Sequence, residues 1–328
     1  MMGPEAEGRL ERRVLLIDRN PRHLAWLSRI LRIVVSDTRE LASLDQRGAG
    51  ELEVDLIVAN YDGLEPAEKR EIVRLVGRPG GPHLLLISSW RDAYRSLWAE
   101  FEPYTLTNLL AKNETVSATE LIVTVQKILR GDIFGLWKYF VWGVPAMTWR
   151  LTASADKPGV IEQVDGYARG LNVHPRLVEM FSLVADELVT NALYNAPRDR
   201  QGRPRTASLP RSEPVALEAG EDVKVTVCCD AQYLGVSITD CFGAFDHLEA
   251  IEHLARNVES GGEPSEESEK GGAGIGLYLA LSQLSHFIVN VCRGERTEVI
   301  GLLDIRGGYK ALASQSKSLN IFVTEPSG

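Results

Sequence analysis

A glycine cluster at residues 271–276 leads directly into an apolar segment, and this junction constrains the fold and function of the chain more than any other feature. The segment reads Gly271-Gly272-Ala273-Gly274-Ile275-Gly276-Leu277-Tyr278-Leu279-Ala280. The apolar run predicts a helix, whose first backbone amides have no partner within the helix. These amides and the helix dipole favour a phosphate group, and glycine allows its close approach. The junction therefore predicts either a phosphate-binding loop or a plain glycine-rich turn.

A helical pattern over residues 183–195 carries polar side chains at every fourth position. Apolar residues at helical spacing predict one buried face. Glu187, Asn191 and Asn195 fall on successive turns and form a polar ridge beside that face. A carboxylate and a carboxamide so placed can hold a hydrated Mg²⁺ and orient a hydroxyl or water. The alternative is an ordinary solvated helix face.

Alternating apolar residues over 234–240 predict a strand that ends at Asp240 in a tight turn containing Gly243. A carboxylate in this turn can accept a hydrogen bond from the exocyclic amine of adenine. The same carboxylate would repel guanine, which has a carbonyl at that position. The alternative is an aspartate that caps the turn.

In chain order, these three motifs resemble the nucleotide site of the GHKL ATPase superfamily, which includes gyrase, heat-shock chaperones, histidine kinases and MutL-type proteins. The resemblance covers residues 146–325. Within it, the segment Glu187-Leu188-Val189-Thr190-Asn191-Ala192 is most similar to the anti-sigma-factor serine kinase branch. The resemblance implies a Bergerat-type α/β sandwich that binds ATP and Mg²⁺.

The resemblance also implies a role for each matching residue. Glu187 would be the catalytic base or a water-orienting carboxylate, and Asn191 would coordinate Mg²⁺. Asn195 would line the same cofactor site, where the family often has histidine. Asp240 would read adenine. The family usually has Asp-x-Gly-x-Gly at this turn, whereas this chain has Asp240-Cys241-Phe242-Gly243-Ala244, which is one residue out of step and lacks the second glycine. The phosphate-facing hinge of the ATP lid would consist of Gly272, Gly274 and Gly276.

The front of the chain, residues 13–130, alternates short apolar strands with amphipathic helices. This order resembles a response-regulator receiver domain and implies a doubly wound parallel sheet. Asp18, Ser88 and Lys112 match the family's site, whereas Arg19 stands at its second acidic position and Asn60 at its phospho-acceptor position. An amide cannot be phosphorylated as a carboxylate can, so we interpret this half as a degenerate receiver that signals by docking. A displaced acceptor at Asp62 is the alternative to an ordinary loop aspartate.

These two halves give a fold class of α/β and α+β, with a receiver-like domain at 13–130, a linker at 131–145 and an ATPase-like domain at 146–325.

The aromatic run at 134–142 is interpreted as a domain-packing segment, with a partner or dimer contact as the alternative. Two polar inserts are expected to be mobile loops. One, at 197–214, carries five arginines that could dock an acidic partner, and the other, at 259–270, carries five glutamates.

Composition narrows the class of protein. The net charge of −9 argues against general nucleic-acid binding. Four cysteines without metal-ligand spacing are expected to be reduced, which favours the cytoplasm. No apolar run reaches about 18 residues, so no membrane span is expected.

Three functions stay open on these observations. The first is a Mg-ATP-dependent serine/threonine kinase that acts on a protein partner, as in bacterial partner switching. The second is a module whose docking is gated by ATP without turnover, and the third is a scaffold that binds no nucleotide. A histidine kinase is disfavoured because no helical segment carries a suitable phospho-acceptor histidine. A homodimer is implied by the resemblance alone.

Overall fold

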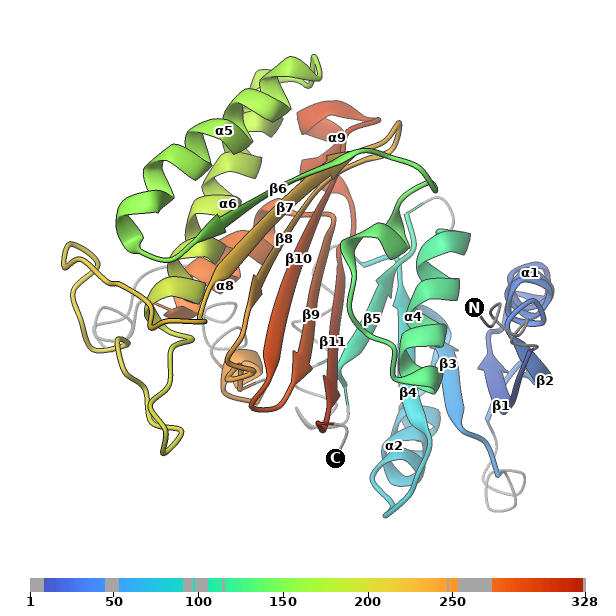
Figure 1. The fold of residues 1–328 in the computed structure, drawn as a ribbon. Coiled ribbons are helices and arrows are strands. Elements are labelled where there is room, and N and C mark those ends of the chain that lie inside the picture. The colour runs from blue at the N-terminus through green and yellow to red at the C-terminus, as the bar shows by residue number, and fades with distance from the viewer. Residues whose placement is uncertain are drawn as a thin grey trace, which may run out of the picture. The chain divides into compact units, whose positions relative to one another are not determined.

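The computed structural model describes residues 9–44, 53–90, 97, 106–113, 116–246, 248–252 and 273–326, with the backbone alone for 273–276. The chain divides into two compact units, Met1–Asp132 and Ile133–Gly328 (Figure 1). Both units combine helices with a β-sheet, so the protein is of the mixed α/β class. Across these ranges, no helix combines the length and apolar character needed to cross a bilayer.

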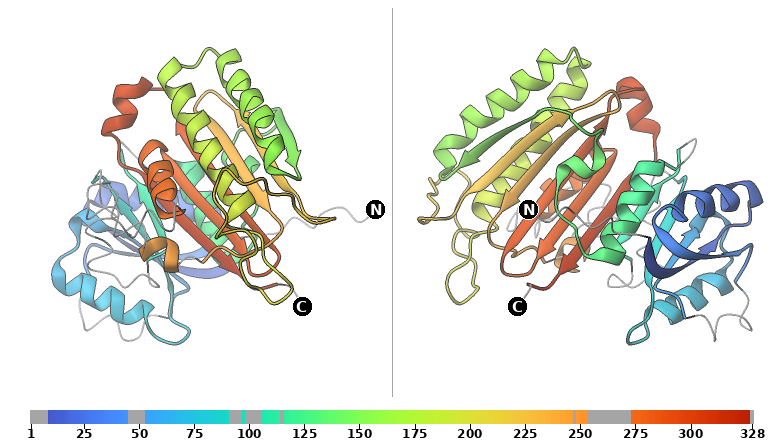
Figure 2. Two further views of the ribbon diagram at one scale, coloured as in Figure 1. Left: turned by 90° about the vertical axis from the view of Figure 1, so that its left-hand side faces the viewer. Right: turned by 45° about the vertical axis from the view of Figure 1, so that its right-hand side comes forward.

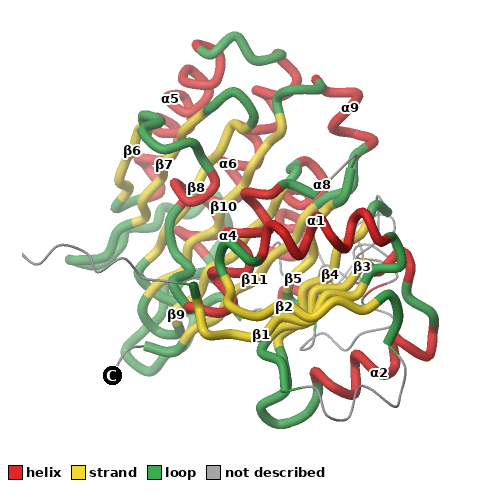
Figure 3. Tube along the Cα trace, turned by 90° about the vertical axis from the view of Figure 1, so that its right-hand side faces the viewer, coloured by secondary structure: helices red, strands yellow, loops and turns green. Residues whose placement is uncertain are grey.

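The first unit contains a parallel sheet with strand order β2-β1-β3-β4-β5. Its strands are β1 (Leu10–Ile17), β2 (Val35–Leu41), β3 (Leu56–Asn60), β4 (His83–Ser88) and β5 (Asn108–Ala111). Its helical segments are α1 (Pro21–Leu31), η2 (Tyr61–Gly63), α2 (Pro66–Val76) and α4 (Ala118–Arg130). Helices α1 and α4 contact each other on one face, and α2 lies on the other (Figure 3). This order is one of the common doubly wound arrangements.

Local sequence explains these elements. Every residue of β3 is buried, as expected for a central parallel strand covered on both faces. Helix α1 begins where the side chain of Asn20 accepts hydrogen bonds from the amides of Arg22 and His23, with Pro21 in the first turn. Helix α4 ends at Gly131 in the left-handed conformation. The sequence did not predict β2, because this strand carries mostly polar residues that are exposed or half-buried.

The second unit has a mixed sheet with strand order β11-β9-β10-β8-β7-β6. Its strands are β6 (Ala146–Leu151), β7 (Val223–Cys229), β8 (Tyr233–Asp240), β9 (His286–Cys292), β10 (Arg296–Asp304) and β11 (Ser318–Thr324). All neighbours pair antiparallel except β11 and β9, which are parallel. Its helical segments are η3 (Leu136–Tyr139), η4 (Ser154–Asp156), α5 (Lys157–Gly170), α6 (Pro175–Tyr194), α8 (Ala273–Gln283) and α9 (Gly308–Ser314).

Helix α6 is the centre of the helical layer. It contacts α5 and α8 on its flanks and β7, β8 and β10 beneath it (Figure 2, left). Its buried face includes Phe181, Ala185, Leu188, Val189 and Ala192. This apolar stripe fixes the rotation of α6, so the polar residues at 187, 191 and 195 fall along one edge of the buried face.

Residues 133–142 cover the opposite face of the same sheet. The amide of Gly135 donates to the Glu298 carboxylate at 2.8 Å, and the Phe140 ring lies against Gly235, where an added Cβ would come within 2.5 Å of it. Leu136 is buried, but Trp142 is 98% exposed. Residues 133–145, most of the linker predicted at 131–145, therefore belong to the second compact unit, because backbone and aromatic contacts attach the segment to the sheet.

The arginine-rich insert at 197–214 also differs from the mobile loop that its composition predicts. Thr206 donates its hydroxyl to the main-chain oxygen of Tyr194 at 2.7 Å. The Tyr194 hydroxyl in turn donates to the carbonyl of Glu213 at 2.8 Å. Arg205 forms ion pairs with Glu218, at 2.6 Å, and with Glu221. The insert is therefore attached to the end of α6, whereas the glutamate-rich segment 259–270 lies outside the described residues.

Candidate functional site

The polar ridge of α6 is a ladder of side-chain hydrogen bonds. Asn195 donates its amide Nδ2 to Oδ1 of Asn191 at 2.8 Å. Asn191 donates its own Nδ2 to Oε1 of Glu187 at 3.2 Å. All three residues are half-buried. The helix thus places the three predicted side chains in one row, with the carboxylate nearest the middle of α6.

The carbonyl oxygen of Asn191 has a second donor from outside the helix. Nη2 of Arg211 lies 3.4 Å from Oδ1 of Asn191. A carbonyl oxygen has two acceptor positions, so Asn195 and Arg211 together fill both. The arrangement around Asn191 therefore does not fit the Mg²⁺ site that the sequence predicts.

Asp240 lies at the end of β8 and is only 6% exposed. One carboxylate oxygen accepts the Phe242 amide at 2.9 Å, and the amides of Gly243 and Thr297 also stabilise the ionised form. Burial outweighs these bonds and the attraction of Arg198, and it raises the pKa of Asp240 to about 6. Asp240 is therefore a turn-capping carboxylate whose charge is costly to bury.

Gly243 forms the turn that Asp240 caps. Its φ of +56° lies in the left-handed region, and a Cβ there would come within 2.1 Å of the carbonyl oxygen of Cys292. Its own carbonyl accepts the amide of Gly294 at 3.1 Å. Only glycine fits this position, so the structure gives Gly243 a backbone role in the turn.

Arg198 connects the ridge with this turn. Its Nη1 donates to the carbonyl of Asn195 at 2.5 Å, and its Nη2 donates to the carbonyl of Ala244 at 3.4 Å. A guanidinium at the C-terminal end of a helix also complements the helix dipole. Burial lowers the pKa of Arg198, while the nearby charges of Asp240 and Glu249 oppose that change. The end of α6 and the Asp240 turn thus meet at one arginine, which sequence reasoning missed.

The glycine cluster is only partly described. Gly272 lies outside the described residues, whereas Gly274 and Gly276 lie in the first turns of α8. The apolar run that follows them extends the helix back to Ala273, so these two glycines are helical and do not form the loop that we predicted. Helix α8 contacts α6, so Gly274 and Gly276 begin a helix that packs against the one carrying the ridge.

A second group that the sequence analysis missed lies on the neighbouring face of α6. Nζ of Lys157, in the first turn of α5, lies 2.8 Å from the Asp186 carboxylate and 2.6 Å from the Thr190 hydroxyl. Thr190 also donates to the main-chain oxygen of Asp186 at 2.7 Å. Asp186 and Thr190 are four residues apart, which was a signal for a shared face, but no sequence pattern indicated their lysine partner.

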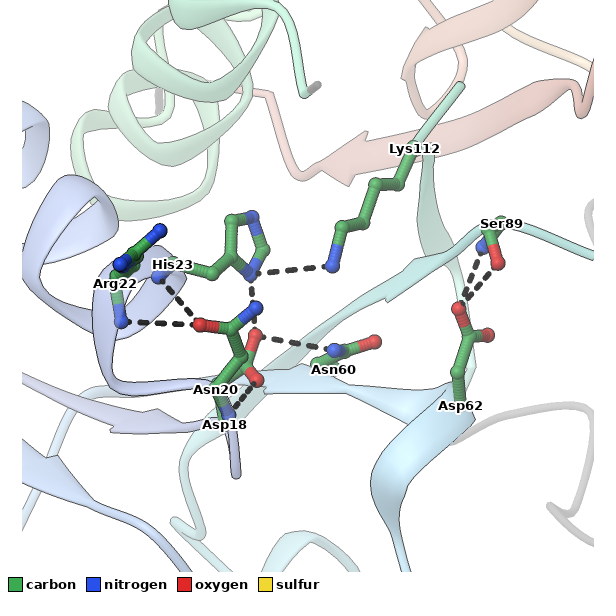
Figure 4. A network of polar contacts seen from close by, with 8 residues as sticks. All are labelled: Asp18, Asn20, Arg22, His23, Asn60, Asp62, Ser89 and Lys112. Carbon is green, nitrogen blue, oxygen red and sulfur yellow. Dashed lines mark hydrogen bonds and ion pairs between the residues drawn. The ribbon is translucent and has the colours of Figure 1, made fainter. Parts of the chain in front are cut away.

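The first unit gathers polar side chains where its parallel strands end (Figure 4). The Asp18 carboxylate accepts the Asn20 amide at 2.8 Å, the Asn60 side-chain amide at 3.0 Å and the His23 ring nitrogen Nδ1. Nζ of Lys112 lies 3.5 Å from the same nitrogen. Burial raises the pKa of Asp18, but the three hydrogen bonds outweigh it and hold the pKa below 3.8.

The other polar residues near the ends of these strands also differ from those of a site for aspartyl phosphorylation. Asp62 uses both carboxylate oxygens to accept the hydroxyls of Ser88 and Ser89, each at 2.6 Å. Figure 4 shows the contact with Ser89. Arg19 donates to the carbonyl of Gly63 and to Glu68, each at 2.6 Å. The carboxylates that a phosphorylation site would need are therefore already bonded to neighbouring side chains.

No protein-family model matches the chain, and no curated protein matches its sequence.

Proposed function

We propose that the second unit is a Bergerat-type nucleotide-binding module of the GHKL kind, which binds ATP and regulates a protein partner through docking. The observation that carries this proposal is the contact of Arg198 with Asn195 at the end of α6 and with Ala244 beyond Asp240. A polar ridge, an adenine-reading carboxylate and a helix preceded by glycines are the three parts of such a site. The arginine contact supports the view that the first two adjoin each other.

The geometry favours docking that is controlled by ATP binding, without hydrolysis of ATP or transfer of its phosphate. Both acceptor positions of Asn191 are filled by protein donors, and the carboxylate of Glu187 already accepts a hydrogen bond from Asn191. The metal that usually neutralises the polyphosphate in phosphoryl transfer has no free ligand atom at Asn191. In this proposal Glu187 orders the ridge by accepting the Asn191 amide.

A serine/threonine kinase is the second candidate, and one observation favours it. Oε2 of Glu187 has no hydrogen-bond partner among the described residues, so it can accept the proton of a substrate hydroxyl. Under this candidate, Glu187→Gln abolishes phosphate transfer and leaves ATP binding intact. Under the docking proposal, the wild-type protein releases and transfers no more phosphate than the Glu187→Gln variant does.

For the first unit, we propose a pseudo-receiver that docks without aspartyl phosphorylation. An amide at Asn60 and an arginine at position 19 that is paired with Glu68 support this proposal. Incubation with a small-molecule phosphoryl donor should leave the mass of the intact protein unchanged. A phosphorylated Asp62 in that experiment would contradict the proposal.

Calorimetric titration tests the nucleotide site directly. We expect saturable ATP binding by the wild-type chain and at least about tenfold weaker binding of GTP, because Asp240 would repel the guanine carbonyl. Asn191→Ala removes the centre of the ridge and should weaken ATP binding, while its melting curve reports whether the fold is retained. Equal affinity for ATP and GTP would contradict adenine reading, and no saturable ATP binding would contradict the proposal.

A further inference from the structure

The sequence predicts that Mg²⁺ supplies the positive charge beside Asn191. In the structure, a guanidinium group lies there instead. A guanidinium lies 3.4 Å from the atom predicted to bind Mg²⁺, and the other acceptor position of that atom holds the Asn195 amide at 2.8 Å. A divalent cation on Oδ1 would have to displace one of these donors. It would also stand beside the Arg211 charge, which repels it.

The position of Arg211 is built into the fold. The Tyr194 hydroxyl donates to the main-chain oxygen of Arg211 at 3.1 Å, which holds the loop backbone beside the last turn of α6. The guanidinium carbon then lies 5.4 Å from the centre of the Tyr194 ring, within the range of a cation–π contact. Tyr194 is itself only 5% exposed. The same residue therefore fixes the Arg211 backbone and supports its side chain.

The Arg211 charge is available to an anionic ligand. The side chain forms no ion pair with any carboxylate in the ranges that the structure describes, and the residue is exposed. Two other arginines of the insert are paired: Arg203 bonds Asp199 and Arg205 bonds two glutamates. A guanidinium can donate two parallel hydrogen bonds to one phosphate group, which suits it to the polyphosphate chain.

From these contacts we infer that Arg211 replaces Mg²⁺ at this site, so that the second unit binds ATP free of metal. The inference rests on the proposed function, because it specifies which form of the nucleotide that site takes. Arg211 supplies the positive charge next to Asn191, and Asn191 orients the guanidinium toward the phosphates. The ridge is then a support for an arginine and not a set of metal ligands.

The test is calorimetry with ATP in two buffers, one with excess Mg²⁺ and one with a chelator. For the wild-type chain we expect the two dissociation constants to agree within about threefold. Arg211→Gln should weaken binding in the chelator by about tenfold to a hundredfold, the range for one lost charge-assisted contact. In the same variant, Mg²⁺ should restore much of the affinity, because Oδ1 of Asn191 has regained an acceptor position.

Arg200→Gln is the matched control. It removes the same charge from an exposed position of the same insert and should bind ATP as the wild type does in both buffers. An equal loss in both arginine variants would assign the effect to overall charge and overturn the inference.

Two further outcomes separate the inference from the proposed function. Wild-type binding that requires Mg²⁺, with Arg211→Gln unchanged, overturns the inference alone and leaves the nucleotide site in place. No ATP binding in either buffer overturns both.

Discussion

The carboxylate of Asp240 accepts the main-chain amide of Phe242 at 2.9 Å, at a position where the side chain is almost completely buried. This bond stabilises the ionised carboxylate, yet burial still raises the pKa of Asp240 to about 6, from an ordinary value of 3.8. The residue that we propose as the adenine reader is therefore also one whose charge opposes folding.

The first prediction concerns stability against pH in Asp240→Asn. Because the folded protein holds this proton more tightly than the unfolded chain, stability should fall as the pH rises from about 4 to 6, by at most roughly 3 kcal/mol. The asparagine variant should lose that slope and be at least as stable as the wild type at pH 7. Urea denaturation at several pH values measures both. An unchanged slope in the variant would contradict the raised pKa.

The second prediction concerns Asp18, whose pKa is shifted in the opposite direction. Its lowered pKa stabilises the fold at every pH above about 3.8, and that contribution is lost as the pH falls through the folded-state value. Asp18→Asn should destabilise the first unit at pH 7 by about 1–3 kcal/mol and reduce its sensitivity to acid. Hydrogen exchange of the α1 amides measures the effect. Asp37→Asn, at an exposed position on β2, is the control and should change neither quantity.

The third prediction compares Gly243 and Gly294, which are joined by a main-chain hydrogen bond. Both have positive φ, +56° at Gly243 and +72° at Gly294, but an added Cβ has no neighbour within 4 Å at Gly294. Gly294→Ala should therefore cost only the backbone strain, about 1–2 kcal/mol. Gly243→Ala should cost clearly more, because its Cβ would overlap the Cys292 carbonyl. Thermal denaturation of the two variants decides this, and equal losses would contradict the close approach.

The fourth prediction concerns the attachment of the arginine-rich insert. Tyr194→Phe removes the hydroxyl whose single proton is shared between two carbonyls of the loop, at Arg211 and Glu213. We expect a loss of about 1–2 kcal/mol and faster cleavage by trypsin after the arginines of residues 197–214. Thr206→Val breaks the other attachment and should act in the same direction. Cleavage as slow as in the wild type in both variants would show that other contacts hold the insert.

Much of the fold could be predicted from apolar patterning. The apolar strands predicted in the front half are present, among them the buried strand at His83–Ser88, and the helix that carries residues 183–194 is present as part of α6. These elements have strong periodic signals, because one or both faces are buried. Strand β2 could not be recognised because it is a polar edge strand, stabilised by pairing with β1 rather than by an apolar face of its own.

The site was predictable only in part, for a similar reason. The spacing of Glu187, Asn191 and Asn195 follows from helix geometry, so their alignment was visible in the sequence. The two arginines that contact this row come from an insert whose path depends on tertiary contacts with Tyr194. No local pattern distinguishes Arg211 from the other arginines of the insert, and its position beside Asn191 emerges only from the folded chain.

The hydrogen bond from Gly135 to Glu298 limits where the chain can be divided for separate study. The Glu298 carboxylate is buried, and its donors are the Gly135 amide, the Ser237 hydroxyl and the Asn290 amide, at 2.8–2.9 Å. A fragment that starts at Ala146 would leave this charge with one donor fewer and uncover the face of the sheet that Phe140 covers. A fragment that starts at Ile133 keeps both contacts. Residues 133–145 therefore belong in any shortened form of the second unit.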